Sequence, residues 1–178
     1  MSSMREFAHP ARKEMAAIDL NRAITNTLTI ARNEYADVAE LETDLCQMPP
    51  VTCHIDQINQ VVLNLVVNAA HAIGDVFKSS GTKGHLSVRT RLDGEDVVIS
   101  VSDTGPGIPE AIREHIFEPF FTTKDVGKGT GQGLALAWKV VTEKHGGALT
   151  YETVLGKGTT FFARLPCAGN RPALIGAA

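Results

Sequence analysis

The sequence is poor in cysteine, poor in aromatic residues and close to neutral in charge. Its three cysteines, Cys46, Cys53 and Cys167, are odd in number and have no C-x-x-C spacing. No histidine stands at metal-ligand spacing from them apart from the adjacent His54. We interpret the cysteines as reduced, unreactive thiols, which predicts a cytoplasmic location.

Charge and hydrophobic runs exclude two further classes of protein. The 17 Lys and Arg residues against 20 Asp and Glu give a formal net charge of −3. The basic residues are scattered singly, so we expect no nucleic-acid binding. No apolar run approaches the roughly 18 residues that span a bilayer, and the first ten residues have no hydrophobic signal region. We therefore expect a chain that is not membrane-inserted, although a parent protein can still be membrane-anchored.

The sequence does contain enough apolar material for one core. With 178 residues and 43% hydrophobic content, it fits a single globular domain with short additions at its ends. We predict a domain over residues 19–166, preceded by a linker-like segment at 1–18 and followed by a flexible tail at 167–178.

Hydrophobic spacing predicts helices and strands in a non-repeating order. Helical spacing predicts helices over 19–34, 58–74 and 134–145, and a short helix that ends near residue 115. Extended or alternating patterns predict strands over 36–45, 85–92, 96–103, 148–153 and 156–166. Together these elements predict an α+β fold, a two-layer α/β sandwich whose mixed, mainly antiparallel sheet has helices on one face.

The stretch DVGKGTGQGLALAWKVV, residues 125–141, has glycine at every second position from 127 to 133 before an apolar helical run. Glycine lets the backbone approach a ligand closely, and free N–H groups at a helix start attract anions, so the stretch suits a phosphate. It is not a Walker A loop, because Thr122 stands where the first glycine belongs. It is not a Rossmann fingerprint, because no strand directly precedes it.

Two asparagines lie four residues apart on an otherwise apolar helix, in LNLVVNAAHA. A single buried asparagine is more often a hydrogen-bonded core residue than a ligand. At this spacing, however, Asn64 and Asn68 favour a shared polar target. Amide oxygens suit Mg²⁺, which is bound by few protein groups together with water and phosphate.

Asp103 follows a predicted buried strand and precedes Gly105 and Gly107 in VSDTGPGIP. On this stretch alone, an Asx turn that caps the strand is the better explanation. The alternative is a carboxylate that accepts a hydrogen bond from an amine while the glycines admit a flat ring. The stretch IFEPFFTTK then places three phenylalanines, which usually form a small core, beside Lys124, which could reach a phosphate. Thr159, at the start of the last strand, indicates nothing by itself.

Taken in order, these blocks resemble the ATP-binding catalytic domain of sensor histidine kinases, within the gyrase, Hsp90, histidine kinase and MutL superfamily. Residues 64–69 are similar to its N box, 103–108 to its G1 box, 117–121 to its F box, 129–134 to its G2 box and 156–159 to its G3 element. The similarity extends over residues 50–166. It implies the Bergerat ATP-binding fold and places the glycine-rich stretch at the end of an ATP lid, which we expect to be the most mobile segment until ATP binds.

The resemblance implies a site for ATP and Mg²⁺. Asp103 would accept a hydrogen bond from the adenine 6-amino group, with Thr159 supporting it through water. Asn68 would hold Mg²⁺. The implied catalytic residues are Asn64, beside the phosphates, and Lys124, which would contact the terminal phosphates. The implied ATP-binding residues are Asn64, Asn68, His71, Asp103, Gly105, Gly107, Ile108, Phe120, Lys124, Gly129, Thr130, Gly131, Gly133, Leu134 and Thr159.

Two absences refine the implied activity. ATPases of the gyrase and Hsp90 type have a Glu, as general base for water, where this chain has Asn64. An amide cannot take that proton, so rapid hydrolysis is disfavoured.

Second, no histidine lies in a helical HE or HD context typical of a phosphoacceptor. Residues 5–24 resemble the exit of the dimerisation and phosphoacceptor hairpin.

The resemblance therefore implies transfer of the γ-phosphoryl group to a histidine on a separate hairpin, and then to the receiver domain of a response regulator. The chain by itself would be monomeric and unable to label itself. Two alternatives stay open: an anti-sigma-type serine kinase, and a degenerate nucleotide-binding regulatory module. An ATP-hydrolysing clamp is disfavoured by Asn64, and a purely structural domain would need five block matches by chance.

Overall fold

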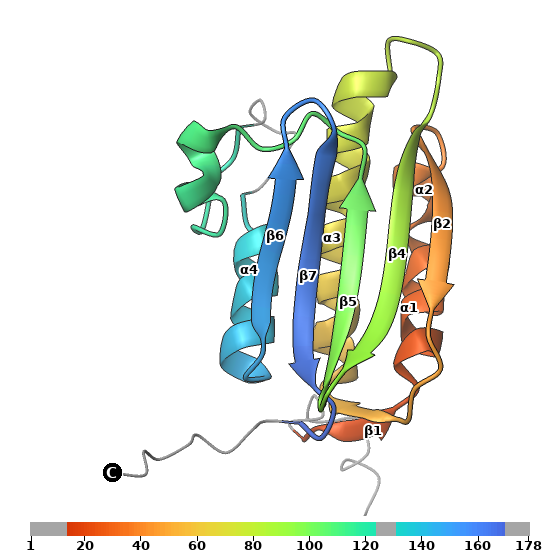
Figure 1. The fold of residues 1–178 in the computed structure, drawn as a ribbon, viewed down its shortest axis with the longest axis vertical. Helices are drawn as coiled ribbons and strands as arrows, with labels where there is room; N and C mark the ends of the chain where they lie inside the picture. The colour runs from red at the N-terminus through yellow and green to blue at the C-terminus, as the bar shows by residue number, and fades with distance from the viewer. Residues whose placement is uncertain (1–13, 124–130, 170–178) are drawn as a thin grey trace, which may run out of the picture.

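The structure is a computed structural model that describes residues 14–123 and 131–169 (Figure 1). Its helices are α1 (Leu20–Ile30), α2 (Arg32–Tyr35), α3 (Ile55–Phe77), the 3₁₀ helix η1 (Glu110–His115), α4 (Gly133–Lys139) and the π-helical turn η2 (Val140–Lys144). Its strands are β1 (Ala16–Ile18), β2 (Ala39–Leu45), β3 (Val51–Cys53), β4 (Gly84–Asp93), β5 (Asp96–Asp103), β6 (Ala148–Val154) and β7 (Gly158–Pro166).

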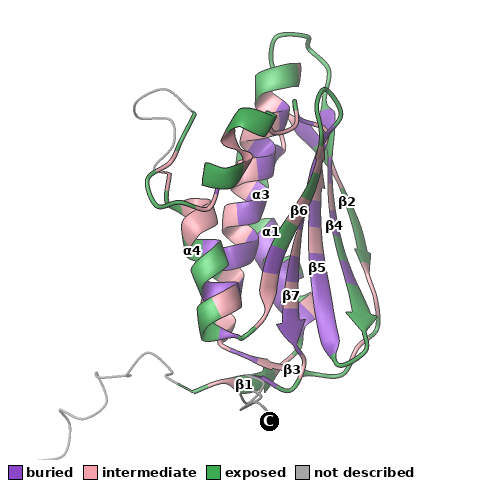
Figure 2. Ribbon diagram, turned by 60° about the vertical axis from the view of Figure 1, so that its left-hand side comes forward, coloured by how far each residue is buried: buried purple, intermediate pink, exposed green. Residues whose placement is uncertain are grey.

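Five strands form the main sheet in the order β2-β4-β5-β7-β6. The β2 and β4 strands run parallel, and every other neighbouring pair in this sheet is antiparallel. Helices α1, α3 and α4 cover one face and leave the other open (Figure 2). The predicted α+β class, with a two-layer sandwich and helices on one face, is confirmed.

The α3 helix is the centre of the core. Its buried residues recur at spacings of three and four: Ile58, Val61, Val62, Leu65, Val66, Ala69, Ala70 and Ile73. They pack between the sheet and the flanking helices α1 and α4. Burial of one large aliphatic side chain contributes about 1.5–3 kcal/mol, so this face, more than helix propensity, holds α3 in place.

By length and composition, α3 could also cross a membrane, since it has 23 residues and a mean hydropathy of 1.3 over 18 of them. It is the one such helix in the part of the chain that the structure describes. Its apolar face is buried against the sheet and the neighbouring helices. Packing in the core therefore accounts for the apolar composition of α3. That composition alone is only weak evidence for a membrane span.

A small second sheet, which the sequence did not predict, joins the two ends of the domain. The β1 strand pairs antiparallel with β3. The Thr52 N–H donates to the Cys167 carbonyl at 2.8 Å, and the Cys167 N–H donates to the Glu95 carbonyl at 2.9 Å. Residue 167, the first of the predicted tail, is thus hydrogen-bonded to the domain. The division of the chain into a linker, a domain and a tail stays a prediction.

The helix predicted over 134–145 has two parts, since α4 continues into the π-helical turn η2. His145 follows η2 and is 1% exposed. Its Nδ1–H donates to the Val140 carbonyl at 2.8 Å, and its Nε2 accepts the His54 N–H at 3.1 Å. His145 therefore links η2 to the residue that precedes α3.

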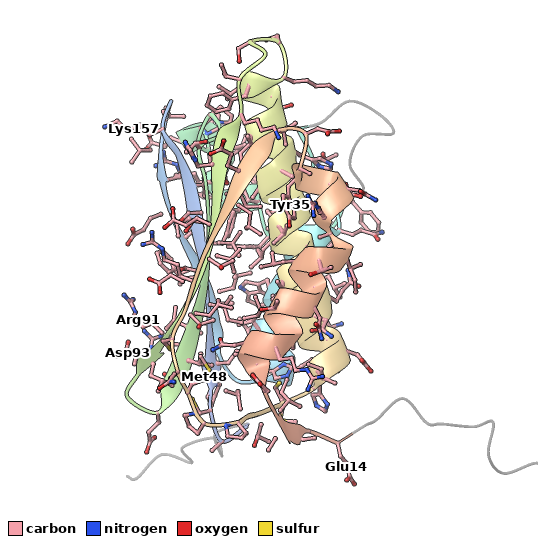
Figure 3. The ribbon with its side chains drawn as sticks, turned by 90° about the vertical axis from the view of Figure 1, so that its right-hand side faces the viewer. Glu14, Tyr35, Met48, Arg91, Asp93 and Lys157 are labelled. Atoms are coloured by element: carbon pink, nitrogen blue, oxygen red, sulfur yellow. The ribbon has the colours of Figure 1, made fainter. Side chains whose placement is uncertain are left out.

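The face of the sheet away from the helices is polar. Arg91 and Asp93 project from this face (Figure 3). Arg164 lies 2.6 Å from the Asp93 carboxylate and 3.2 Å from that of Asp96.

Cys53, the last residue of β3, is buried, which raises the pKa of its thiol to about 11. A thiol with that pKa is unreactive, as the sequence predicted.

Candidate functional site

A cavity of about 680 Å³ lies between the outer half of α3, the loop after β5 and the start of α4. Ten of the sequence-predicted site residues line it: Asn64, Asn68, His71, Asp103, Gly107, Ile108, Gly131, Gly133, Leu134 and Thr159. A second hollow, of about 800 Å³ and more open, lies beside the start of α1 and contains none of them. The predicted polar residues, far apart in sequence, therefore converge on one cavity.

Five predicted residues are not part of the cavity wall as described. Gly105 lies behind it, where a Cβ would come 2.7 Å from the Ala72 Cβ. Phe120 does not line it, because its side chain turns to solvent and the residue is 71% exposed. Lys124, Gly129 and Thr130 lie outside the described residues, as does most of the expected lid.

One face of α3 carries the two asparagines. Asn64 Nδ2 donates to the Gly133 carbonyl at 3.2 Å, while Asn64 Oδ1 accepts from Gln60 at 2.8 Å. Asn64 therefore links α3 to the first residue of α4, and both ends of its amide have partners. Asn68, one turn further along, presents its amide to the same cavity.

Asp103 is the buried carboxyl group of the cavity. It ends β5 and is 7% exposed. Burial raises the pKa of this carboxyl to about 6, although the backbone N–H groups of Gly105 and Thr159 donate to it and favour the charged form. The predicted Asx turn is present, because the Gly105 N–H lies 2.9 Å from Oδ1. Near neutral pH the group is an ionised hydrogen-bond acceptor on the cavity wall.

The loop after Asp103 interlocks with the hairpin between β6 and β7. Gly107 has a φ of 78°, and a Cβ there would lie 2.6 Å from the Val154 carbonyl oxygen. The Gly156 N–H donates to the Pro106 carbonyl at 2.8 Å. Only glycine fits this close approach at this backbone conformation.

Phe120 and Gly131 join the two ends of the segment between η1 and α4. The Phe120 N–H donates to the Gly131 carbonyl at 2.8 Å. Phe120 has a φ of 64°, the only positive value among the described non-glycine residues. A bulky residue in this conformation is strained, and such strain often marks a functional segment.

Sequence reasoning missed most of the apolar wall of the cavity. Its residues are Leu63, Val67, Ile112, Ile116, Phe121, Leu155 and Phe161. Leu63 and Val67 each precede a predicted asparagine by one position. A polar cavity residue was also missed: Asp75 lies one turn beyond His71 on the same face of α3. Helical spacing from Asn64 would have found Asp75, whereas η1 and the β6–β7 turn carried no such signal.

The cavity fits Mg²⁺ only as an ion shared with a phosphate ligand. Within residues 14–123 and 131–169, no group of three or more His, Cys, Asp or Glu side chains could hold a metal ion. The Asn64 oxygen already accepts from Gln60, so Asn68 supplies the available amide oxygen. Mg²⁺ commonly uses one or two protein groups plus phosphate and water, which this arrangement allows.

Comparison with known proteins finds sensor histidine kinases. The chain is 36% identical over 176 residues to the sensor histidine kinase ZraS of Klebsiella oxytoca, a match that covers 96% of this chain and 36% of that protein. The chain thus spans about a third of the length of this relative.

Solved structures give the same result for the fold. The nucleotide-free catalytic domain of the histidine kinase ThkA is similar, with a TM-score of 0.74 and 29% identity, covering 87% of this chain and 97% of that one. Full-length ShkA in complex with AMPPNP is similar with a TM-score of 0.72 and 25% identity, covering 90% of this chain and 32% of that one.

Residues 53–169 match the family described as histidine kinase-, DNA gyrase B-, and HSP90-like ATPase. This range includes every cavity residue named above. Because the match covers more than half of the chain and holds its whole cavity, the chain belongs to the family of histidine kinase-, DNA gyrase B- and HSP90-like ATPases.

Proposed function

We propose that the chain is the catalytic domain of a histidine kinase, which binds Mg-ATP and transfers its γ-phosphoryl group to a histidine on a separate hairpin. The observation that carries this proposal is the convergence of the Asp103 carboxylate and the Asn68 amide on one cavity. The first suits the amine of an adenine base, and the second suits a metal-bound phosphate. The likeness to ZraS, ThkA and AMPPNP-bound ShkA supports the same assignment.

The residues divide the cavity into a base end and a phosphate end. At the base end, Asp103 accepts from the adenine amine, and Ile108 supplies apolar wall. At the phosphate end, Asn68 supplies an oxygen for Mg²⁺. Gly133 has no side chain and so leaves its backbone accessible to the phosphates. Bound Mg²⁺ would neutralise charge on the phosphates. The protein's part in the transfer is then positioning and electrostatic stabilisation.

Two described residues that could suggest another reaction, water activation or self-labelling, are already engaged in hydrogen bonds. Asn64, which holds the position of the general base in other ATPases, has both ends of its amide engaged. His145 is buried with both ring nitrogens hydrogen-bonded, so it cannot accept a phosphoryl group. The partners that we propose are the dimerisation and phosphoacceptor hairpin of a parent kinase and, next, the receiver domain of a response regulator, as the likeness to ZraS supports.

The proposal extends to the state of the chain. We expect the chain to be monomeric and to work in the cytoplasm. The parent kinase of which it would be the catalytic domain can be membrane-anchored. An anti-sigma-type serine kinase remains the second candidate for the same site. Phosphorylation of a supplied serine substrate instead of a histidine hairpin would favour it.

Thermal unfolding with and without ADP or AMPPNP, each with and without Mg²⁺, tests the proposal. Ligand at about a hundred times its dissociation constant stabilises the folded state by roughly 2.7 kcal/mol, which gives a clear rise in Tm. The rise should depend on adenine nucleotide and disappear in Asp103→Asn. A supplied hairpin should then become labelled on histidine. If no nucleotide shifts the Tm of the wild type, the chain is a degenerate module instead.

A further inference from the structure

Three strands place three polar side chains in one row at the base end of the cavity. Asp103 on β5 lies directly opposite Thr159 on β7, and Thr159 lies opposite Thr153 on β6. Asp103 and Thr159 line the cavity, whereas Thr153 stands behind Thr159 and does not. Thr153 belongs to none of the motifs that the sequence analysis identified.

The Thr153 hydroxyl has three hydrogen-bond neighbours. The Ile108 N–H donates to its oxygen at 2.9 Å, and the hydroxyl donates to the Gly158 carbonyl at 3.2 Å. The third neighbour is the Thr159 hydroxyl, whose oxygen lies 2.9 Å away. The first neighbour can only donate and the second can only accept.

Only one arrangement of the protons forms all three of these hydrogen bonds at once. A hydroxyl has one proton and two lone pairs. The proton of Thr153 goes to Gly158, and one lone pair accepts from Ile108. In this arrangement the remaining lone pair of Thr153 accepts the proton of the Thr159 hydroxyl. Thr159, which is 6% exposed, then has only lone pairs left for a ligand in the cavity.

We propose that Thr153 is a positioning residue that sets base specificity, because it turns the Thr159 proton away from the cavity and leaves only acceptors beside Asp103. Two acceptors favour a 6-amino purine, which donates, and disfavour a 6-oxo purine, which presents a carbonyl oxygen there. Through its bond to the Ile108 N–H, the same hydroxyl also holds the loop after Asp103 against the β6–β7 hairpin. This inference rests on the proposed function, which places a purine nucleotide in the cavity.

Binding of ADP and inosine diphosphate, measured by calorimetry on the full chain, tests the inference. Inosine diphosphate has an oxygen in place of the 6-amino group of ADP. Thr153→Val keeps the shape of the side chain but removes the hydroxyl, so Thr159 can turn its proton into the cavity. The preference for ADP over inosine diphosphate should then fall roughly five- to tenfold, as expected for one or two neutral hydrogen bonds.

Two further variants separate the hydroxyl from the rest of the side chain. Thr153→Ser keeps the hydroxyl and should hold the nucleotide preference within about threefold of wild type. Thr150→Val makes the same change three residues earlier on β6, where Thr150 is exposed, and should leave the preference unchanged.

An equal loss of affinity for both nucleotides in Thr153→Val would overturn the inference, because it would indicate a structural role alone. If Thr153→Val does not fold, Thr159→Val should show the same fall in preference, and an unchanged preference there would overturn the inference. Failure of the wild type to bind either nucleotide would instead overturn the proposed function. The two failures are therefore distinguishable.

Discussion

At the scale of single residues, the site depends on where charge and hydrogen-bond donors are placed. Asp103 is buried at a strand end, and its pKa of about 6 lies well above the ordinary value of 3.8. Both ends of the Asn64 amide are hydrogen-bonded to the protein, to Gln60 and to Gly133. Asn68 lies on the cavity wall and takes no part in these bonds. Two asparagines of one motif therefore have separate tasks: Asn64 links two helices, and Asn68 is the proposed metal ligand.

The stability of the free domain should depend on pH through Asp103. In the unfolded chain its carboxyl ionises near pH 3.8, whereas in the folded chain it stays protonated up to about pH 6. Its contribution to the free energy of unfolding is thus largest below pH 4 and falls by up to about 3 kcal/mol as the pH rises through 6. Because other groups also titrate in this range, the measure is the free energy of unfolding of the wild type minus that of Asp103→Asn, which urea unfolding should show to be smaller at pH 7.5 than at pH 5.

Gly107→Ala should be far more damaging than the same change at Gly94. Both glycines have positive φ, but a Cβ at Gly107 would meet the Val154 carbonyl at 2.6 Å, whereas at Gly94 no atom lies within 4 Å. We expect Gly94→Ala to cost about 1 kcal/mol of unfolding free energy and Gly107→Ala about 2–4 kcal/mol, with loss of ADP binding. Equal costs in urea unfolding would contradict the close approach seen here.

At the scale of elements, the ends of the helices that form the cavity are linked to one another. His145 accepts the His54 N–H before α3 and donates to Val140 in η2. Its burial lowers the pKa of the imidazole below 6.5. The group must stay neutral to accept from His54, so the link holds only while the ring is unprotonated.

His145→Leu should lower the unfolding free energy by about 2–4 kcal/mol, because it leaves a buried donor and a buried acceptor without partners. Relative to His145→Leu, the wild type should lose stability as the pH falls below 6.5, since the unfolded histidine then binds a proton that the folded one resists. Denaturant melts at pH 5.5 and 7.5 measure both effects. His85→Leu, at an exposed residue, is the control and should leave the pH dependence intact.

Hydrophobic spacing predicted the elements that are long and one-sided. The buried positions of α3 recur so regularly that its core face could be read from the sequence, and the β4–β5 hairpin follows from alternation around Gly94. The three-residue strands β1 and β3 and the π-helical turn η2 could not be predicted, because their pairing depends on contacts between distant segments. Thr153 could not be identified from the sequence for the same reason, because its proposed role depends on hydrogen bonds to Ile108, Gly158 and Thr159.

At the scale of the whole molecule, the two ends of the described domain lie side by side. A Cβ on Gly169 would come 3.2 Å from the Met15 sulfur, and both segments lie beside β3. The cavity residues of α3 begin eight positions beyond its start and extend to Asp75. At 1.5 Å per residue, Asn68 is about 20 Å along the helix from that end.

A circular permutant should therefore fold and bind nucleotide. In it, a short glycine linker joins residue 169 to residue 15, and the chain is opened at Gly81, in an exposed turn with free space around it. We expect circular dichroism like that of the wild type and an ADP affinity within about threefold. A permutant opened inside β5 is the matched control and should not fold.

The adjacency of the entering and leaving segments makes the domain an exchangeable unit. A neighbour attached before β1 and another attached after β7 would both be joined at the end of the molecule that lies away from the nucleotide cavity. Gene fusion or recombination could then change either neighbour while the catalytic end stays untouched, so that one catalytic unit can be supplied with many different inputs.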